Sequence, residues 1–138
     1  MTTSTKITLT NQLDELERLR LLVSEFGGTH GFKAEDKTAV HLCLEEMATN
    51  IISYAWPKEE SHEFEIRLSV DETTIKAEFE DDGVAFDPTH ASDADTTSDV
   101  AQRPIGGLGI HLVKSTMNTL YYQRVEERNV LIAKKQRS

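Results

Sequence analysis

Two runs of alternating apolar and polar residues, joined by a short polar segment, constrain the fold of this chain more than any other feature. The runs span 64–70 and 75–79, with Asp-Glu-Thr at 71–73 between them. Side chains of a strand point alternately to its two faces, so each run has one apolar face. The pattern predicts an antiparallel hairpin whose apolar face other elements must cover. That face carries Phe64, Ile66, Leu68, Val70, Ile75, Ala77 and Phe79.

Three segments have apolar residues at every third or fourth position and are predicted to be the helices that cover this face. Capping residues, glycines and a proline suggest where each one begins and ends. The first is expected from an N-cap at Asn11 to Gly27 and Gly28, the second from Glu35 or Asp36 to Ala55 before Pro57, and the third from Gly106 and Gly107 through Leu120.

Shorter alternations at both ends of the sequence add further strands. Ile7 and Leu9 alternate with threonines near the start, and a second hairpin is expected through Tyr122 and Val125 and then Val130 and Ile132. About five strands joined mostly as hairpins, together with three helices, predict the α+β class. We expect a two-layer α/β sandwich, with a mainly antiparallel sheet that has helices on one face, as a single domain over residues 1–138.

Charge and cysteine content exclude several classes of function. The 24 acidic residues outnumber the 15 basic ones, giving a formal net charge of -9 that would repel nucleic acid and anionic membranes. The single cysteine, Cys43, rules out an internal disulfide or a thiolate metal cluster, and no apolar run approaches the length of a membrane span. We therefore expect a cytoplasmic protein that binds neither nucleic acid nor membranes.

Two groups of polar residues could carry chemistry. Glu46 and Asn50 are four positions apart and so project from one side of the second predicted helix, where they could share a ligand or simply form a solvated face. Four carboxylates surround Gly83 in the stretch 80–88, which could be a binding site or an ordinary Asp-Gly turn. Each group alone leaves both interpretations open.

A glycine-rich segment, Gly-Gly-Leu-Gly at 106–109, stands directly before the third predicted helix. Exposed backbone N–H groups and the positive end of a helix dipole suit a phosphate chain, although a flexible hinge would have the same composition. Lys114 does not follow a glycine, so this is not a P-loop, and Leu112 occupies the place of the third glycine in the dinucleotide fingerprint.

The order of these three groups resembles that of the GHKL ATPase superfamily. Residues 46–55, Glu-Met-Ala-Thr-Asn-Ile-Ile-Ser-Tyr-Ala, are similar to its N box, and residues 81–88, Asp-Asp-Gly-Val-Ala-Phe-Asp-Pro, to its first glycine box. Residues 106–113, Gly-Gly-Leu-Gly-Ile-His-Leu-Val, are similar to the second glycine box. The Phe-Asp-Pro ending and the glutamate at the head of the N box resemble the anti-sigma factor serine/threonine kinase branch.

The resemblance implies a site for ATP and Mg²⁺. Asn50 would coordinate the ion and Glu46 would be the general base toward an attacking hydroxyl, roles that suit a hard carboxamide oxygen and a carboxylate one helical turn away. Gly107 and Gly109 would hold the phosphates, and residues 87–105 would form the ATP lid, ordered only when nucleotide binds. Arg103, at its end, has no assigned role.

At the other end of the implied site, Asp81 would accept a hydrogen bond from the adenine amino group, and Gly83 would let the base lie close to the backbone. Many relatives have a second glycine where this sequence has Ala85, so we expect a slightly narrower pocket. His111, within the second glycine box, is expected to be a helix-surface residue.

The function implied by the resemblance is that of an ATP-dependent serine/threonine protein kinase acting as an anti-sigma factor. Its partners would be an anti-anti-sigma (STAS-like) protein, which it phosphorylates, and a sigma factor, which it sequesters, and it would be a homodimer. The alternative is an ATP-gated binding module without phosphotransfer, which would need no base at Glu46. A histidine kinase fragment is not expected, because His30, His41 and His62 lack the setting of a phosphoacceptor.

Overall fold

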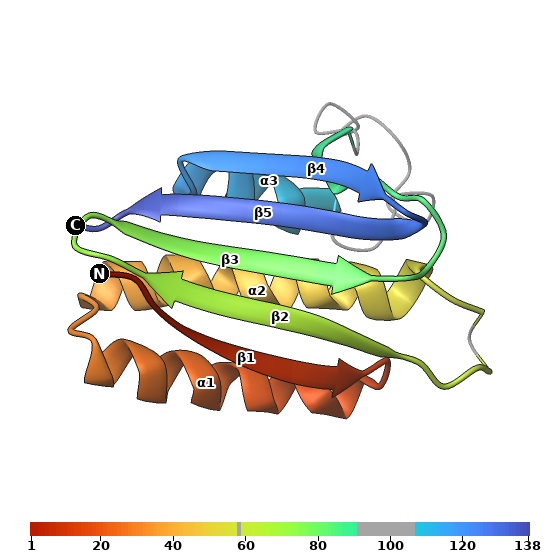
Figure 1. Cartoon of the computed structure of the whole chain (residues 1–138), viewed down its shortest axis with the longest axis horizontal. Coiled ribbons are helices and arrows are strands. Elements are labelled where there is room, and N and C mark those ends of the chain that lie inside the picture. Colours follow the sequence, from red (N-terminus) through yellow and green to blue (C-terminus); the bar gives the residue numbers. More distant parts are fainter. Residues whose placement is uncertain (58, 91–106) are drawn as a thin grey trace.

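The described residues of the chain form a five-stranded antiparallel sheet with three α-helices on one of its faces (Figure 1). The structure, a computed structural model, describes residues 1–57, 59–90 and 107–138. Its elements, with 3-10 helices written η, are β1 (Thr3–Thr10), η1 (Leu13–Glu15), α1 (Leu16–Thr29), α2 (Ala34–Tyr54), β2 (Glu63–Val70), β3 (Thr74–Asp81), η2 (Pro88–His90), α3 (Gly107–Thr116), β4 (Thr119–Val125) and β5 (Arg128–Gln136). The predicted α+β sandwich is confirmed.

The strand order in the sheet is β1-β2-β3-β5-β4, and every neighbouring pair is antiparallel. β2 and β3 form the predicted hairpin, and β4 and β5 form the second one. Because β5 lies between β3 and β4, the end of β3 is in register with the start of β5, where Asp81 pairs with Asn129. This placement brings two polar residues together that are 48 positions apart in the sequence.

The core lies between the sheet and the helices, and at one end it becomes polar. Along β3 every second side chain is buried, first Ile75, then Ala77 and Phe79, and finally Asp81. The buried stripe of α2 likewise ends in a polar residue, Asn50. Buried polar side chains are uncommon, and here two of them end the apolar faces of α2 and β3. Their position indicates a functional site at this end of the core.

The first helix differs from its prediction at both ends. Asn11 does not cap it, because the Asn11 side chain donates to the Glu60 carbonyl at 2.8 Å and accepts from the His62 amide at 3.0 Å, which joins the end of β1 to the start of β2. Gly27 and Gly28 lie inside α1 instead of ending it. Gly31, which follows the helix, has a left-handed backbone conformation with φ of 71°. The helix therefore ends about one turn later than predicted.

The last third of the chain holds one further correction. α3 ends at Thr116, and Leu120 belongs to β4, since the Asn118 amide already donates to the Lys134 carbonyl and so joins the sheet. The predicted second hairpin is confirmed; in β5 the buried apolar side chains are Leu131 and Ala133, while Val130 and Ile132 are half-buried. No helix in the described ranges combines the length and apolar composition needed to cross a bilayer.

Candidate functional site

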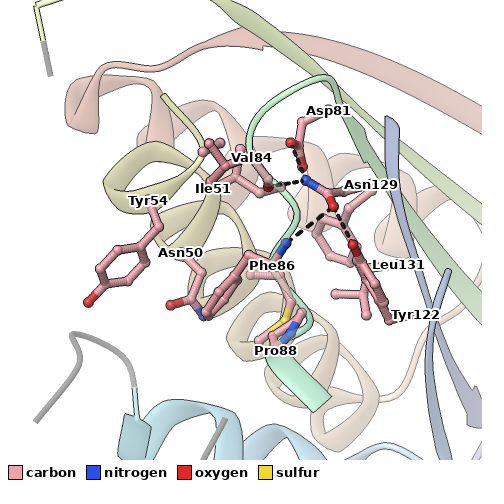
Figure 2. Close-up of a pocket in the computed structure, with 13 residues that line it drawn as sticks. Asn50, Ile51, Tyr54, Asp81, Val84, Phe86, Pro88, Tyr122, Asn129 and Leu131 are labelled. Atoms are coloured by element: carbon pink, nitrogen blue, oxygen red, sulfur yellow. Dashed lines mark hydrogen bonds between the residues drawn. The ribbon is translucent and has the colours of Figure 1, made fainter. Parts of the chain in front are cut away.

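A pocket opens where the polar ends of α2 and β3 meet, and Figure 2 shows its residues. Asn50 and Tyr54 reach it from α2, Asp81 from β3, and Asn129 from β5, so the sheet and the helix layer both contribute. The complete lining is Met47, Asn50, Ile51, Tyr54, Ala55, Phe79, Asp81, Val84, Phe86, Pro88, Tyr122, Asn129 and Leu131. The fold thus brings Asn50 and Asp81, two of the predicted site residues, into one pocket.

Asp81 is held in a defined orientation deep in this pocket. Its side chain is 4% exposed, and its Oδ1 accepts hydrogen bonds from the Gly83 amide and from Asn129 Nδ2, both at 2.9 Å. Burial raises the pKa of Asp81, although the two hydrogen bonds and the positive charge of Arg124 act in the opposite direction. Within the described part of the chain, neither bond uses Oδ2, which leaves that oxygen for a donor from a ligand.

The backbone after Asp81 needs glycine for a packing reason. A Cβ on Gly83 would overlap the Cβ and carbonyl of Ala55, because the turn lies directly on the end of α2 and the Val84 amide donates to the Ala55 carbonyl at 2.8 Å. Gly83 itself is not part of the pocket lining. The expected narrowing of the pocket by Ala85 is wrong, since Ala85 is exposed and also lies outside the lining.

Asn50 has an unusual environment for a buried amide. Its side chain is 3% exposed, and neither its oxygen nor its nitrogen has a hydrogen-bond partner in the described part of the chain. Leaving such groups unpaired costs about 1–3 kcal/mol, so a ligand is the expected partner. The arrangement fits Mg²⁺, which usually takes one or two protein oxygens and completes its shell with water and substrate phosphates. No cluster of three or more acidic, histidine or cysteine side chains competes for a metal among the described residues.

Glu46 lies one helical turn before Asn50 and faces α3. Its carboxylate packs on Gly109, where a Cβ would overlap the Glu46 side chain. Partial burial raises the pKa of Glu46, and the neighbouring Glu45 adds to this effect. A carboxylate with a raised pKa is a better proton acceptor, as a general base requires.

The N-terminus of α3 comes from the glycine-rich segment, as predicted. The helix begins at Gly107, Gly109 is buried against Glu46, and Ile110 and Val113 anchor the helix in the core. His111 is exposed, as expected for a surface histidine. Of the predicted lid, only 87–90 is described, where Pro88–His90 forms η2; residues 91–105, with Arg103, lie outside the described residues.

Three residues around Asp81 were not predicted from the sequence. Asn129 contacts Asp81 directly, and Tyr122 and Arg124 both donate to the Asn129 side chain. The signal that could have indicated Asn129 is its alternation with Leu131 and Ala133, which places all three on one face of β5. This signal was ambiguous because Val130 and Ile132, on the opposite face, are apolar as well.

The fold and the site together define a class of protein. It is an α+β sandwich with a pocket that contains buried polar groups between the sheet and α2, close to the N-terminus of α3, which is suited to binding phosphate. Comparison with known proteins agrees with this class. The family model described as "Histidine kinase-like ATPase domain" matches residues 9–135, so the chain belongs to this family, which is the GHKL family expected from its motifs.

Curated relatives include proteins named "Serine-protein kinase RsbW" from Bacillus cereus (strain AH820), Bacillus anthracis and Bacillus thuringiensis (strain Al Hakam). Each is 27% identical to this chain over 120 residues, covering 84% of this chain and 74% of the relative. The chain is therefore similar to named serine-protein kinases over most of its length. This similarity supports an ATP-using, kinase-like protein at the family level.

Proposed function

We propose that this protein is an ATP-dependent serine/threonine protein kinase that acts as an anti-sigma factor. It would phosphorylate an anti-anti-sigma protein of the STAS type and sequester a sigma factor, as a homodimer in the cytosol. The partners and the dimer follow from the family resemblance. The kinase activity is supported by the names of the relatives and by the chemistry of the site.

The single observation that carries the proposal is the pair formed by Asn50 and Glu46. A buried amide without a partner in the described chain stands one helical turn from a partly buried carboxylate with a raised pKa. A module that only binds nucleotide would benefit from the amide, but it has no use for a desolvated carboxylate beside the phosphate-binding helix. The pair is the arrangement that phosphoryl transfer to a hydroxyl requires.

In the proposed reaction, the residues of this chain divide between binding and proton transfer. Asp81 accepts a hydrogen bond from the adenine amino group, and the backbone at Gly107 and Gly109 holds the phosphates at the start of α3. Asn50 contributes an oxygen ligand to Mg²⁺, which supplies charge neutralisation when bound. Glu46 accepts the proton of the acceptor serine or threonine as its oxygen forms the new bond to the γ-phosphorus of ATP. The bond from that phosphorus to the bridging oxygen breaks, and ADP is the leaving group.

The test compares Glu46→Gln with Glu45→Gln. The acceptor is a STAS-type protein captured from source cytosol on the immobilised chain, and phosphate incorporation and ATP affinity are both measured. Glu46→Gln should keep ATP affinity and reduce transfer by about a hundredfold or more, the scale of positioned general-base catalysis. Glu45→Gln removes a carboxylate from the adjacent, exposed position, which only adds to the effect of burial on the pKa of Glu46, so this variant should reduce transfer far less than Glu46→Gln.

Two outcomes would contradict the proposal in different ways. Transfer by Glu46→Gln at the parent rate would remove Glu46 from the reaction and leave it as a carboxylate of the α2–α3 contact. ATP binding by the parent without transfer to the captured partner would favour the ATP-gated binding module.

A further inference from the structure

The Asn129 side chain is the centre of a hydrogen-bonded polar cluster in the pocket wall (Figure 2). It is 6% exposed and makes five hydrogen bonds with described residues. We propose that Asn129 is a positioning residue for adenine recognition, which fixes the Asp81 carboxylate and the turn after it in one arrangement. This inference rests on the proposed function and names a determinant of its nucleotide specificity.

The NH₂ group of the Asn129 side chain links the end of β3 to the turn that follows it. Asn129 Nδ2 donates to Asp81 Oδ1 at 2.9 Å and to the Val84 carbonyl at 2.8 Å. Both of its hydrogens are therefore used. Because Asp81 Oδ1 is occupied by Asn129 and the Gly83 amide, the carboxylate cannot rotate freely, and Oδ2 is the oxygen left for the ligand.

The acceptor side fixes which way the amide points. Asn129 Oδ1 accepts from the Tyr122 hydroxyl, from Arg124 Nη1 at 3.1 Å and from the Phe86 amide at 3.4 Å. A rotated amide would place its NH₂ group against these donors and its oxygen against the Asp81 carboxylate. Only a side chain with two donors on one atom and an acceptor on the other satisfies all five partners, and among natural residues of this size that is asparagine.

The β4–β5 hairpin delivers this residue to the site. Asn129 pairs with Asp81 on one side and with Arg124 on the other, so one row across three strands carries the cluster. The two-residue turn between the strands, Glu126 and Glu127, has φ of 50° and 65°, the left-handed geometry that tight hairpin turns require. The turn fixes the register between β4 and β5, and this register places Asn129 beside Arg124.

The charged and titratable groups around the cluster determine how a second carboxylate would behave there. Arg124 supplies positive charge from β4 and also donates to the Gly83 carbonyl at 2.8 Å. Asp82 adds negative charge next to Asp81, while Tyr122 from β4 and Tyr54 from α2 also line the pocket. Burial already disfavours charge on Asp81, so the site has little capacity for another negative group.

Asn129→Asp tests the proposal because it keeps the shape of the side chain and reverses one hydrogen bond. Two carboxylates at this separation share one proton, and the shared proton restores the link between them while Asp81 Oδ2 still faces the ligand. Above the second pKa of the pair the proton is lost, the carboxylates repel each other, and binding requires a proton to be taken up. ATP affinity of this variant should then fall by roughly tenfold per pH unit.

The experiment measures ATP and GTP affinity by calorimetry between about pH 6.5 and about pH 9 for the parent, Asn129→Asp and Asn118→Asp. The affinity of the parent for ATP should stay flat or rise slightly with pH, because ionisation of Asp81 strengthens the hydrogen bond that it accepts from the adenine amino group, and the parent should discriminate against GTP. Asn129→Asp should lose affinity as the pH rises and discriminate less. Asn118→Asp makes the same chemical change at a position outside the pocket, where the side-chain oxygen accepts from the Gln136 amide, and it should match the parent.

The outcomes separate this inference from the proposed function. A parent that binds no ATP would overturn both. A parent that binds ATP, together with a folded Asn129→Asp variant of equal affinity and equally flat profile, would overturn the inference alone. If circular dichroism shows that Asn129→Asp is unfolded, Tyr122→Phe decides: loss of one donor to Asn129 should weaken ATP binding by roughly two- to tenfold, and parent affinity would overturn the proposal.

Discussion

The two ends of the pocket differ in whether their buried polar groups have hydrogen-bond partners in the described chain. At the Asp81 end, a carboxylate and the Asn129 amide are satisfied by hydrogen bonds from three strands and a turn. At the Asn50 end, an equally buried amide has no partner in the described chain, and the nearby Glu46 carboxylate is partly desolvated. We infer that the first end is organised before the ligand arrives and that the second keeps its polar groups available for it.

Gly83 and Gly109 allow a direct test of this comparison, because Gly83 lies against backbone atoms and Gly109 against the tip of a side chain. Gly83→Ala would place a methyl group against the carbonyl of Ala55, which the Val84 amide holds in position, so the backbone must shift. Gly109→Ala would meet the tip of the Glu46 side chain, which can rotate away. We expect Gly83→Ala to lower the free energy of unfolding by about 3 kcal/mol and Gly109→Ala to change it by less than about 0.5 kcal/mol.

Urea denaturation of both variants, with transfer assays on the folded one, would measure this difference. Gly109→Ala should still lose phosphotransfer, because rotation moves the carboxylate from its place beside α3. Equal losses of stability at the two positions would mean that the two ends are equally rigid.

Asp81→Asn changes only the charge at the organised end. A hydrogen bond to a charged group is worth about 1.5–3 kcal/mol, so ATP affinity should fall by roughly ten- to a hundredfold. Asp82→Asn is the matched control, because Asp82 is exposed and accepts from Trp56 Nε1 at 3.1 Å outside the pocket. Calorimetry that finds the same ATP affinity for both variants and the parent would remove Asp81 from the binding site.

The same substitution at two asparagines should change stability in opposite directions. Asn50→Leu replaces an unpartnered buried amide with an apolar group of similar size, and the free energy of unfolding should rise by about 1 kcal/mol while Mg²⁺-dependent ATP binding is lost. Asn129→Leu leaves Asp81 and several donors unsatisfied, and the free energy of unfolding should fall by about 1–2 kcal/mol. Thermal melts of the nucleotide-free variants provide the measurement. A loss of stability in Asn50→Leu would show that the amide has a structural partner.

Much of the fold follows from local patterns that need no tertiary information. The alternation over 64–79 predicted the β2–β3 hairpin, and the apolar stripe ending at Ala55 predicted α2 to within two residues of its observed start and one of its end. Ordered motifs also indicated Asn50, Asp81 and Gly109 as candidates. These features are visible in sequence because each depends on neighbours within one or two turns of chain.

The errors arose where distant segments decide the local structure. Asn11 has the composition of a helix cap, but its partners are Glu60 and His62, about 50 positions away, which no local rule can detect. β5 is apolar on both faces, so its burial depends on the turn at Glu126 and Glu127 and on pairing with β3.

Linear patterns were enough to predict the two layers, the three polar motifs and the family, because periodicity and motif order are properties of a linear chain. Which polar groups are hydrogen-bonded depends instead on how distant segments pack. Asn50 and Asn129 are the same residue type, yet one is unpartnered in the described chain and the other makes five hydrogen bonds. The difference comes from strand order and helix packing, which place partners from 43 to 48 positions away around Asn129 and, within the described chain, none around Asn50.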